Sequence, residues 1–161
     1  MVRPQHEPVM VEEVLDFLAP RPGGTYLDLT LGGGGHARRI LLSEPTCTLV
    51  GVDRDRETLE RTAAELSSFG SRFRAQWVRF DLADEVAEGV GPERFDGVLL
   101  DLGMSSIQVD APERGFGFQQ DGELDLRMDR SRGATAADLL RDLPERELAE
   151  LLFRLGDEKR S

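Results

Sequence analysis

Four consecutive glycines, Gly32 to Gly35, lie between a run of strand-like composition at residues 25–31 and a run of helical composition at residues 36–42. At such a strand-to-helix turn, small residues let a ligand approach the backbone, and free helix N–H groups favour an electron-rich ligand. The alternative is a tight turn without a ligand. A phosphate-binding P-loop is disfavoured, because no Gly-Lys-Ser/Thr follows the glycines. The turn therefore favours a nucleotide-type ligand at the end of the first strand.

The glycine turn belongs to a regular alternation of strand-like and helix-like segments. Apolar spacing predicts a first helix over residues 11–18, and helical composition recurs at residues 36–42 and 56–67. Short apolar or β-branched runs predict strands at residues 25–31, 48–53, 75–80 and 95–102. This order predicts an α/β fold with a parallel, doubly wound sheet and right-handed crossovers.

The character of the chain changes near residue 103. Residues 103–133 have no sustained apolar period and predict a long loop. Thr135 with Asp138 then resembles a capping box and predicts a short helix. Asp142 with Glu145 resembles a second box, ahead of an apolar stripe that needs a partner surface and consists of Leu148, Leu151, Leu152 and Leu155.

Composition limits the possible partners. The chain has 161 residues with 20 Lys and Arg against 31 Asp and Glu, which gives a formal net charge of −11. This balance argues against a surface that attracts polyanions or anionic membranes as a whole. Cys47 is the only cysteine, so neither an internal disulfide nor a cysteine-rich metal cage is possible. Because no apolar run approaches the roughly 20 residues that span a bilayer, and the polar start lacks a signal-peptide core, we expect a cytoplasmic protein.

Two aspartates stand at predicted strand ends, where parallel sheets place their ligands. Asp53 ends the second strand, and a carboxylate at this position can accept hydrogen bonds from both hydroxyls of a ribose. Its alternative role as a helix cap is filled by the neighbouring Asp55. Asp101 directly follows the apolar fourth strand, so we expect it to face the ligand crevice.

Other candidates have an ordinary alternative role. Phe80 ends the predicted third strand and can flank an adenine or simply belong to the core. His36 opens the helix after the glycine turn and can donate to a ligand carboxylate or act as a solvated cap. The loop from Gln108 to Asp129 mixes both charges with aromatic side chains, which suits either a substrate-binding lid or a solvated loop with internal ion pairs.

A nicotinamide-dependent oxidoreductase is the competing function. A glycine-rich turn followed by an acidic residue about 20 positions later also suits that cofactor. However, Ala37 stands where the third glycine of the dinucleotide pattern belongs, and no Tyr-Lys or comparable hydride-transfer pair is present. Spacing alone leaves both an adenosyl-type ligand and a nicotinamide dinucleotide open, and it favours the former.

Several motifs taken together resemble one family. They are Gly-Gly-His at residues 34–36, Gly-Val-Asp-Arg-Asp at 51–55, Leu-Leu-Asp-Leu-Gly-Met-Ser-Ser at 99–106 with Gln108, Glu-Arg-Gly-Phe-x-Phe at 113–118 and Asp-Gly-x-Leu-Asp-x-Arg-Met-Asp at 121–129. The first two are generic to methyltransferases, whereas the motifs from Asp101 to Asp129 are close to family-specific. From about His6 to Glu158, the chain resembles the MraW family, the ribosomal RNA small-subunit methyltransferase H family.

The resemblance implies a Rossmann-like class I methyltransferase that uses S-adenosylmethionine, here called the donor, to methylate N4 of a cytosine. The family's target lies in the decoding region of bacterial 16S rRNA, within the small ribosomal subunit, and no metal is implied. Carried over by motif, the residues that contact the donor are Gly34, Gly35, His36, Asp53, Phe80, Asp101 and Gln108. The resemblance assigns neither a catalytic residue nor an oligomeric state to this chain.

The sequence departs from the family pattern in three ways. Leu29 stands in place of a Gly, and Ile107 replaces a Pro before Gln108. Family members are also roughly twice as long, which predicts an incomplete enzyme with a hydrophobic edge at its fourth strand. We expect residues 1–109 to be the N-terminal part of the donor-binding domain, and residues 110–161 to be a loop and the start of a helical insertion domain. A truncated fragment that binds the donor without catalysis is the alternative.

Overall fold

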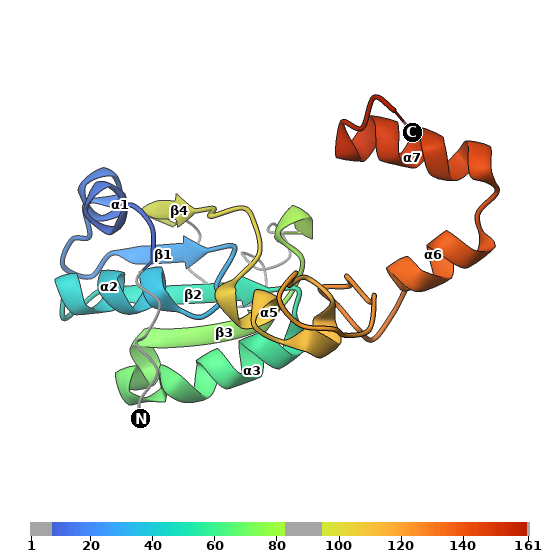
Figure 1. The fold of residues 1–161 in the computed structure, drawn as a ribbon. Helices are drawn as coiled ribbons and strands as arrows, with labels where there is room; N and C mark the ends of the chain where they lie inside the picture. Colours follow the sequence, from blue (N-terminus) through green and yellow to red (C-terminus); the bar gives the residue numbers. More distant parts are fainter. Residues whose placement is uncertain (1–7, 83–94, 161) are drawn as a thin grey trace. The chain divides into compact units, whose positions relative to one another are not determined.

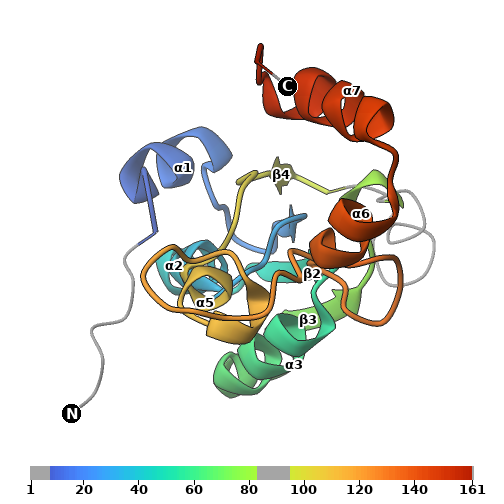
Figure 2. The ribbon, with the colours of Figure 1, turned by 45° about the vertical axis from the view of Figure 1, so that its right-hand side comes forward.

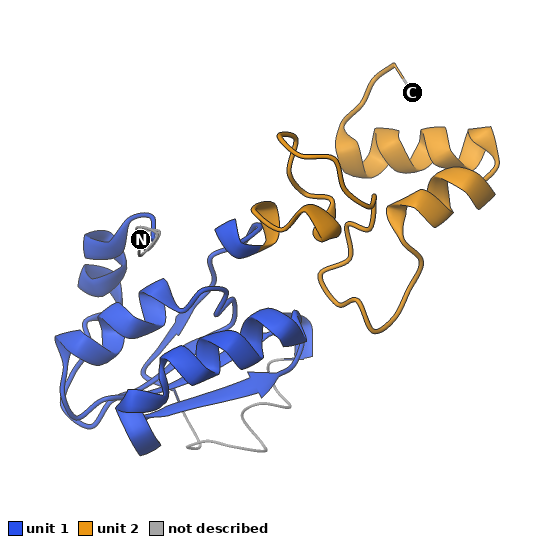
Figure 3. Cartoon of the chain, turned by 60° about the horizontal axis from the view of Figure 1, so that its bottom comes forward, with its two compact units in different colours: residues 1–107 blue, residues 108–161 orange. Residues whose placement is uncertain are grey.

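The computed structural model describes residues 8–82 and 95–160, and the chain divides into two compact units (Figure 3). Unit 1 comprises Met1–Ile107 and unit 2 comprises Gln108–Ser161. The sheet lies in unit 1, whereas the described part of unit 2 consists of short helices and loops. Every helix within the described ranges is too short or too polar to span a bilayer.

Unit 1 is built on a four-stranded parallel sheet, which confirms the predicted α/β fold class. Its strands are β1 (Thr25–Asp28), β2 (Thr48–Asp53), β3 (Phe73–Trp77) and β4 (Gly97–Leu99). They lie side by side in the order β3-β2-β1-β4 (Figure 1). The chain moves outward from β1 to β3 and then returns to place β4 on the other side of β1. This reversal is the switch point of a doubly wound sheet, where ligands bind at the carboxyl ends of the strands.

The register brings the ends of three strands to one edge. Asp28 at the end of β1 pairs with Gly51 of β2 and with Leu99 of β4. Asp53 lies two residues beyond Gly51, so its side chain points to the same face of the sheet as that of Asp28. Asp101 follows the last residue of β4 by two positions. The backbone therefore gathers three carboxylates at the carboxyl edge.

Three helices lie along one face of this sheet (Figure 2), namely α1 (Val11–Leu18), α2 (Gly35–Ser43) and α3 (Arg56–Glu65). Their apolar side chains and those of the strands form the main core, which includes Tyr26, Ile40, Leu49, Leu59 and Phe73. A smaller buried cluster forms from Leu27, Leu29, Val50 and Val52. Successive residues of β1 and β2 thus enter different clusters, because strands of a parallel sheet bury both faces.

The predicted strands differ from the observed ones mainly in their ends. The strands predicted over residues 25–31 and 95–102 end three residues earlier, as β1 and β4. The strand predicted over residues 75–80 is β3, which begins two residues earlier and also ends three residues earlier. The residues after each strand leave the ladder to form the loops that carry the candidate site. Short 3₁₀ helices follow α3 and β3, namely η1 (Ser67–Arg72), which is interrupted at Gly70, and η2 (Phe80–Leu82).

The predicted loop over residues 103–133 is partly wrong, because it contains two short helical turns, α5 (Ser106–Val109) and η3 (Pro112–Arg114). Pro112 favours the second of these, since its fixed φ suits the first position of a helical turn. The rest of that segment has no regular helix or strand. The two helices expected after it are present as α6 (Ala136–Asp142) and α7 (Glu145–Gly156).

One of the two predicted capping boxes is confirmed. The Thr135 side chain accepts a hydrogen bond from Asp138 N, and the Asp138 carboxylate accepts one from Thr135 N. The second predicted box is wrong, since α7 follows Pro144 without a side-chain cap. The Asp142 carboxylate instead accepts hydrogen bonds from the Arg141 guanidinium. The apolar side chains of α7 are largely exposed within the described residues, and Leu155 is 81% exposed.

The glycine turn is fixed by both backbone conformation and packing. Gly34 precedes α2 with a φ of +72°, and a Cβ at this position would lie 2.6 Å from Thr62 Cγ2. Thr62 is itself held in place, because its Oγ1 donates to Gly32 O over 2.7 Å. A Cβ on Gly35 would lie 2.9 Å from Pro8 Cγ. The close approach of α3 and of Pro8 therefore requires glycine at both positions.

We predict that Gly34→Ala destabilises unit 1 more than Gly23→Ala does. Gly23 has a φ of +70° but open space around a Cβ, so the pair separates conformational strain from steric clash. Strain costs about 1–2 kcal/mol at either position. The clash at Gly34 adds about 1–3 kcal/mol. Urea unfolding followed by circular dichroism measures both losses, and equal losses would contradict the packing argument.

Candidate functional site

Three aspartates lie at the carboxyl edge of the sheet, one at or after the end of each of three neighbouring strands. Asp28 ends β1, Asp53 ends β2, and Asp101 follows β4. The charges of Asp53 and Asp101 both raise the pKa of Asp28, so each of these two carboxylates is close enough to Asp28 to repel it. Within the described residues, no group of three or more His, Cys, Asp or Glu side chains is arranged to hold a metal ion. The edge is a region of concentrated negative charge.

Asp53 connects the end of β2 to the glycine turn and to α3. Its Oδ2 accepts a hydrogen bond from Gly32 N over 2.8 Å, and its Oδ1 accepts one from Asp55 N over 2.9 Å. Asp55 caps α3, as the sequence predicts, by accepting from Thr58 N. Burial raises the pKa of Asp53. Since each carboxylate oxygen can accept more than one hydrogen bond, Asp53 retains capacity for the hydroxyls of a ribose.

Asp28 is the residue of this edge that the sequence analysis missed. It is 1% exposed, and its Oδ1 accepts a hydrogen bond from Thr30 N over 3.0 Å. Burial, with smaller contributions from the charges of Asp53 and Asp101, raises the pKa of Asp28 to about 7. The signal in the sequence was a single carboxylate within the otherwise apolar run from Tyr26 to Leu31, where burial of a charge is costly.

Asp101 and His36 face each other at the same edge. The backbone after β4 is held by Thr30, whose Oγ1 accepts a hydrogen bond from Asp101 N over 2.7 Å. His36 Nε2 lies 3.6 Å from Asp101 Oδ2. The Asp101 side chain is 49% exposed, whereas His36 is 8% exposed and its Nδ1 has no hydrogen-bond partner among the described residues. His36 is therefore a buried side chain with an unsatisfied nitrogen, not the solvated cap of the alternative interpretation.

The glycine turn also borders a cavity of about 320 Å³. The cavity is lined by residues of the turn together with Pro8 and Val11 near α1, Arg38, Arg39 and Leu42 of α2, and Glu65 and Leu66 at the end of α3. None of the three edge aspartates lines it. The cavity is thus separate from the carboxylate edge, and the site is built from strand ends and not from this hollow.

Phe80 does not end the third strand as predicted, because β3 ends at Trp77 and Phe80 begins the turn η2. Phe80 is 41% exposed. The aromatic residue that the register places beside Asp53 is Trp77. Its indole Nε1 donates to Arg54 O over 3.0 Å, and the Arg56 guanidinium lies 5.3 Å from its ring centre. Sequence reasoning overlooked Trp77 because the predicted strand placed it away from the strand end.

Gln108, the remaining predicted contact, lies in unit 2 as a buried residue of α5. The other predicted residues, from Gly34 to Asp101, all belong to unit 1. Among these, the structure gathers His36, Asp53 and Asp101 at the carboxyl edge, and the glycine turn is joined to that edge through Gly32.

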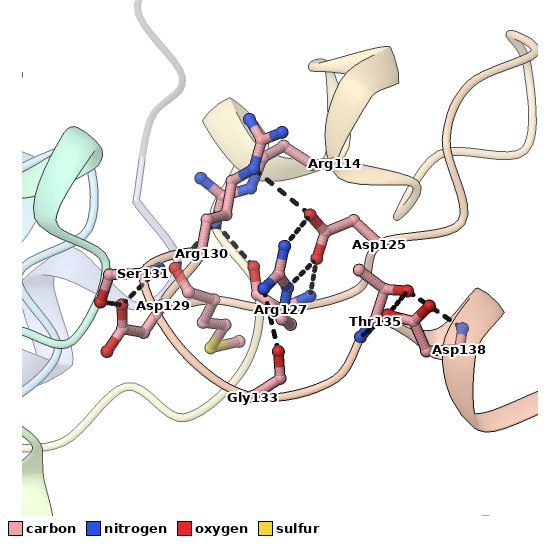
Figure 4. A network of polar contacts seen from close by, with 10 residues as sticks. Arg114, Asp125, Arg127, Asp129, Arg130, Ser131, Gly133, Thr135 and Asp138 are labelled. Carbon is pink, nitrogen blue, oxygen red and sulfur yellow. Dashed lines mark hydrogen bonds and ion pairs between the residues drawn. The ribbon is translucent and has the colours of Figure 1, made fainter. Parts of the chain in front are cut away.

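Unit 2 holds a network of charged side chains around Asp125 (Figure 4). The Asp125 carboxylate accepts hydrogen bonds from Arg127 Nε over 2.7 Å and Arg127 Nη2 over 2.9 Å. Arg130 Nε lies 3.3 Å from the same carboxylate. Hydrogen bonds from Arg127 hold the pKa of Asp125 down, at about 2. The network therefore holds this loop in place, although the sequence predicts no regular helix or strand for it.

A further arginine, Arg114, holds the backbone of this loop in place. Arg114 is 4% exposed, and its Nη2 donates to Arg127 O over 3.1 Å and to Met128 O over 2.9 Å. Asp129 accepts hydrogen bonds from Ser131 and Arg132. The structure shows internal ion pairs in this loop. Arg114 and the carboxylates of Asp125 and Asp129 are buried, so this part of the loop is not solvated. The interpretation as a substrate-binding lid stays a prediction.

Comparison with known proteins identifies the family. A family model described as the MraW methylase family matches residues 3–161. The chain belongs to this family. It is 51% identical over 160 residues to the ribosomal RNA small subunit methyltransferase H of Pelobacter propionicus, with 96% of this chain and 50% of the relative covered. The protein of the same name from Gluconobacter oxydans is 48% identical, with 100% of this chain and 49% of the relative covered.

The chain spans about half the length of the curated relatives it matches. Among solved structures, a geranyl diphosphate methyltransferase in complex with S-adenosylmethionine is 27% identical with a TM-score of 0.37, over 43% of this chain and 29% of that one. Because this structural match is partial and its score is low, the family assignment rests on the sequence comparisons. Membership of a methylase family does not favour the oxidoreductase alternative.

We predict that Asp28→Asn removes part of the pH dependence of stability. A carboxylate whose pKa is raised on folding holds its proton in the folded state, so unfolding free energy falls as pH rises from about 4 to about 7. The shift from 3.8 to about 7 corresponds to at most about 4 kcal/mol. Asp53 contributes in the same direction, so a smaller slope persists in the variant.

Urea unfolding at several pH values between about 4 and about 8 measures this slope for both proteins, because denaturant curves yield the unfolding free energy at each pH. The comparison concerns slopes, so a constant packing penalty of the Asn side chain does not affect it. A variant with an unchanged slope would show that Asp28 is not the group responsible.

We also predict that Arg114→Lys loosens the loop of unit 2. A lysine keeps the charge but lacks the planar donor group that reaches both Arg127 O and Met128 O. The loss is about 1–3 kcal/mol of local stability. Hydrogen exchange of residues 112–135 measures it. Arg141→Lys is the control, because Arg141 pairs with Asp138 and Asp142 at the exposed surface of α6, and equal effects of the two variants would refute the prediction.

Proposed function

We propose that unit 1 binds S-adenosylmethionine across the carboxyl ends of β1, β2 and β4. We further propose that the whole protein methylates N4 of a cytosine in the decoding region of 16S rRNA, with the small ribosomal subunit as its substrate. The observation that carries the proposal is the hydrogen bond between Gly32 N and Asp53, which joins the two motif elements that bind an adenosyl group. The names of the relatives support the RNA substrate.

The residues present fit the donor. Asp53 has spare acceptor capacity for ribose hydroxyls, and His36 Nδ1 is a buried nitrogen that lacks a partner among the described residues. We assign the ribose to Asp53 and the donor's carboxylate to His36. Gly34, Gly35, Phe80, Asp101 and Gln108 complete the proposed set of contacts. Phe80 is half-exposed in its turn, which leaves it able to lie against an adenine ring.

The bound donor supplies an electrophilic methyl group on a sulfonium. The cytosine amino nitrogen is a poor nucleophile, because its lone pair is delocalised into the ring. We propose that the Asp101 carboxylate, or a main-chain carbonyl of residues 102–104, accepts a hydrogen bond from this amino group, which returns electron density to the nitrogen and orients it. Gly103 has open space around it, so a base can approach this segment closely. Such a base must first be unstacked from the RNA.

RNA recognition in this proposal does not depend on a basic surface. The chain has a net charge of −11, and the arginines around Asp125 are engaged by carboxylates of the same loop. We therefore propose that the assembled subunit is recognised by shape, or that phosphate contacts come from parts of the relatives that this chain does not span. Residues 110–161 would then be the start of the helical domain that meets the substrate, and residues 1–109 the donor-binding part.

Titration calorimetry with the donor tests the cofactor part of the proposal. Asp53→Ala removes a charge-assisted acceptor and should weaken donor binding by at least about tenfold. Asp16→Ala is the control, because it removes an equal charge from the exposed surface of α1. Circular dichroism of each variant separates loss of binding from loss of folding. Binding of NADH without binding of the donor would refute the proposal.

Methyl transfer tests the substrate. Small ribosomal subunits that lack the modification are incubated with a labelled donor and either the whole protein or this chain alone, and the digested nucleosides are identified by mass spectrometry. We expect the label on N4 of one cytosine. Donor binding without any transfer would favour the alternative, a fragment that binds the donor without catalysis. A steep salt dependence of RNA binding by this chain alone would contradict recognition by shape.

A further inference from the structure

The cavity beside the glycine turn is not used by the proposed function. It has a volume of about 320 Å³, and all the residues that line it belong to unit 1. Of the residues proposed to contact the donor, only Gly34 and Gly35 line it. Small-molecule sites have volumes of roughly 300–1,000 Å³, so this cavity is large enough for a small ligand. The side chains that line it indicate what kind of ligand fits.

One of the two arginines that line the cavity has no partner among the described residues. Arg39 Nη2 lies 3.1 Å from Glu12 Oε1, so this arginine is engaged by α1. The guanidinium of Arg38, which is half-buried, makes no hydrogen bond or ion pair within the described part of the chain. Acidic residues outnumber basic ones in this chain by 31 to 20, yet none of those described engages Arg38. Because a guanidinium presents several donors in a planar fork, Arg38 offers a binding point for a phosphate or a carboxylate.

α3 contributes a hydrogen-bond acceptor to the same cavity. Glu65 lines it from the end of α3, and its Oε1 accepts a hydrogen bond from Arg61 Nε over 3.2 Å. Each carboxylate oxygen can accept more than one hydrogen bond, so Glu65 retains capacity for a hydroxyl or amino group of a ligand. The remaining side chains of the lining are apolar, namely Pro8, Val11, Leu42 and Leu66. The cavity thus combines an unpaired cation, an acceptor and an apolar surface.

We propose that this cavity binds a nucleotide, with its phosphate on the Arg38 guanidinium and its ribose or base against the apolar side chains. A hydroxyl or amino group of the ribose or base then donates to Glu65. The phosphate pairs with a guanidinium that otherwise lacks a partner, and the rings cover apolar surface that otherwise faces water. The inference goes beyond the proposed function, because the cavity is separate from the carboxylate edge and takes an anion.

Smaller or uncharged ligands use only part of this lining. Inorganic phosphate satisfies Arg38 but leaves the apolar side chains uncovered, and a nucleoside leaves Arg38 without an anion. Both should therefore bind more weakly than the nucleotide. The same phosphate chemistry occurs in a free nucleotide and in a single-stranded segment of RNA, so these are the two sources of the ligand that an experiment must separate.

Titration calorimetry and amide NMR spectra of the 161-residue chain with uridine 5′-monophosphate test the inference. Uracil is neither the base of the donor nor the base of the proposed target, so this probe avoids both parts of the donor site. Uridine and inorganic phosphate are the comparison ligands. Arg38→Gln removes the cation, and Leu42→Trp narrows the cavity without a change in charge, since Leu42 is 60% exposed and can be enlarged without repacking the core. Arg141→Gln at the exposed surface of α6 is the control.

We expect uridine 5′-monophosphate to bind at least about tenfold more tightly than uridine or inorganic phosphate, because only the nucleotide uses both the cation and the apolar surface. Arg38→Gln should weaken its binding at least about tenfold, and Leu42→Trp should weaken it as well. Arg141→Gln should leave it unchanged. Equal effects of Arg38→Gln and Arg141→Gln, or amide signals of residues 33–35 that do not shift on binding, would overturn the inference.

Titration in the presence of saturating donor separates this cavity from the donor site. The affinity for uridine 5′-monophosphate should change by less than about twofold, and competition between the two ligands would overturn the inference. Failure of the donor to bind, with the nucleotide still bound through Arg38, would contradict only the proposed function. A uridine pentanucleotide identifies the source of the phosphate. Tighter binding than that of the mononucleotide, lost in Arg38→Gln, assigns the cavity to RNA, and weaker binding assigns it to a free nucleotide.

Discussion

The hydrogen bonds to the Asp53 carboxylate hold the site of unit 1 together. One oxygen accepts from Gly32 N in the glycine turn, and the other accepts from Asp55 N at the start of α3. A single side chain at the end of β2 thus fixes the glycine turn and the start of a helix in relation to one strand. His36 lies in α2, directly after the glycine turn, and Asp101 lies in the segment after β4. The two side chains meet at the carboxyl edge of the sheet.

A buried aspartate has opposite electrostatic surroundings in the two units. In unit 2, Asp125 is paired with arginines, and its pKa is lowered to about 2. In unit 1, Asp28 is buried near other carboxylates, and its pKa is raised to about 7. Paired charges stabilise a loop at neutral pH, whereas charges without a cation oppose folding and favour a positive ligand. This contrast is the physical reason for assigning structure to the network of unit 2 and ligand binding to the edge of unit 1.

The glycine turn is required for the packing of unit 1 and also belongs to the proposed donor site. Gly34 and Gly35 leave no room for side chains because Thr62 and Pro8 lie against them. The requirement for glycine at these positions would exist without any ligand, so the glycines alone indicate the fold more strongly than the chemistry. The specific indication comes from the aspartates at the strand ends, since a carboxylate at a buried edge is unfavourable without a partner.

The sequence by itself determined the strand and helix order, the capping residues Asp55 and Thr135, and the two candidates Asp53 and Asp101 at the carboxyl edge of the sheet. These follow from local patterns, because alternation, capping and strand ends depend on neighbouring residues. Its family-specific motifs also led to the family that the comparisons confirm. Those motifs are short contiguous segments, so they are visible without the fold.

Only the tertiary structure showed that Asp28 is the most buried of the edge carboxylates, that Trp77 and not Phe80 ends β3, and that Asp142 is engaged by Arg141 instead of capping α7. Each of these outcomes depends on which strand lies beside which, or on a competition between two possible partners. Register and burial arise from residues far apart in the chain, so no local pattern contains them.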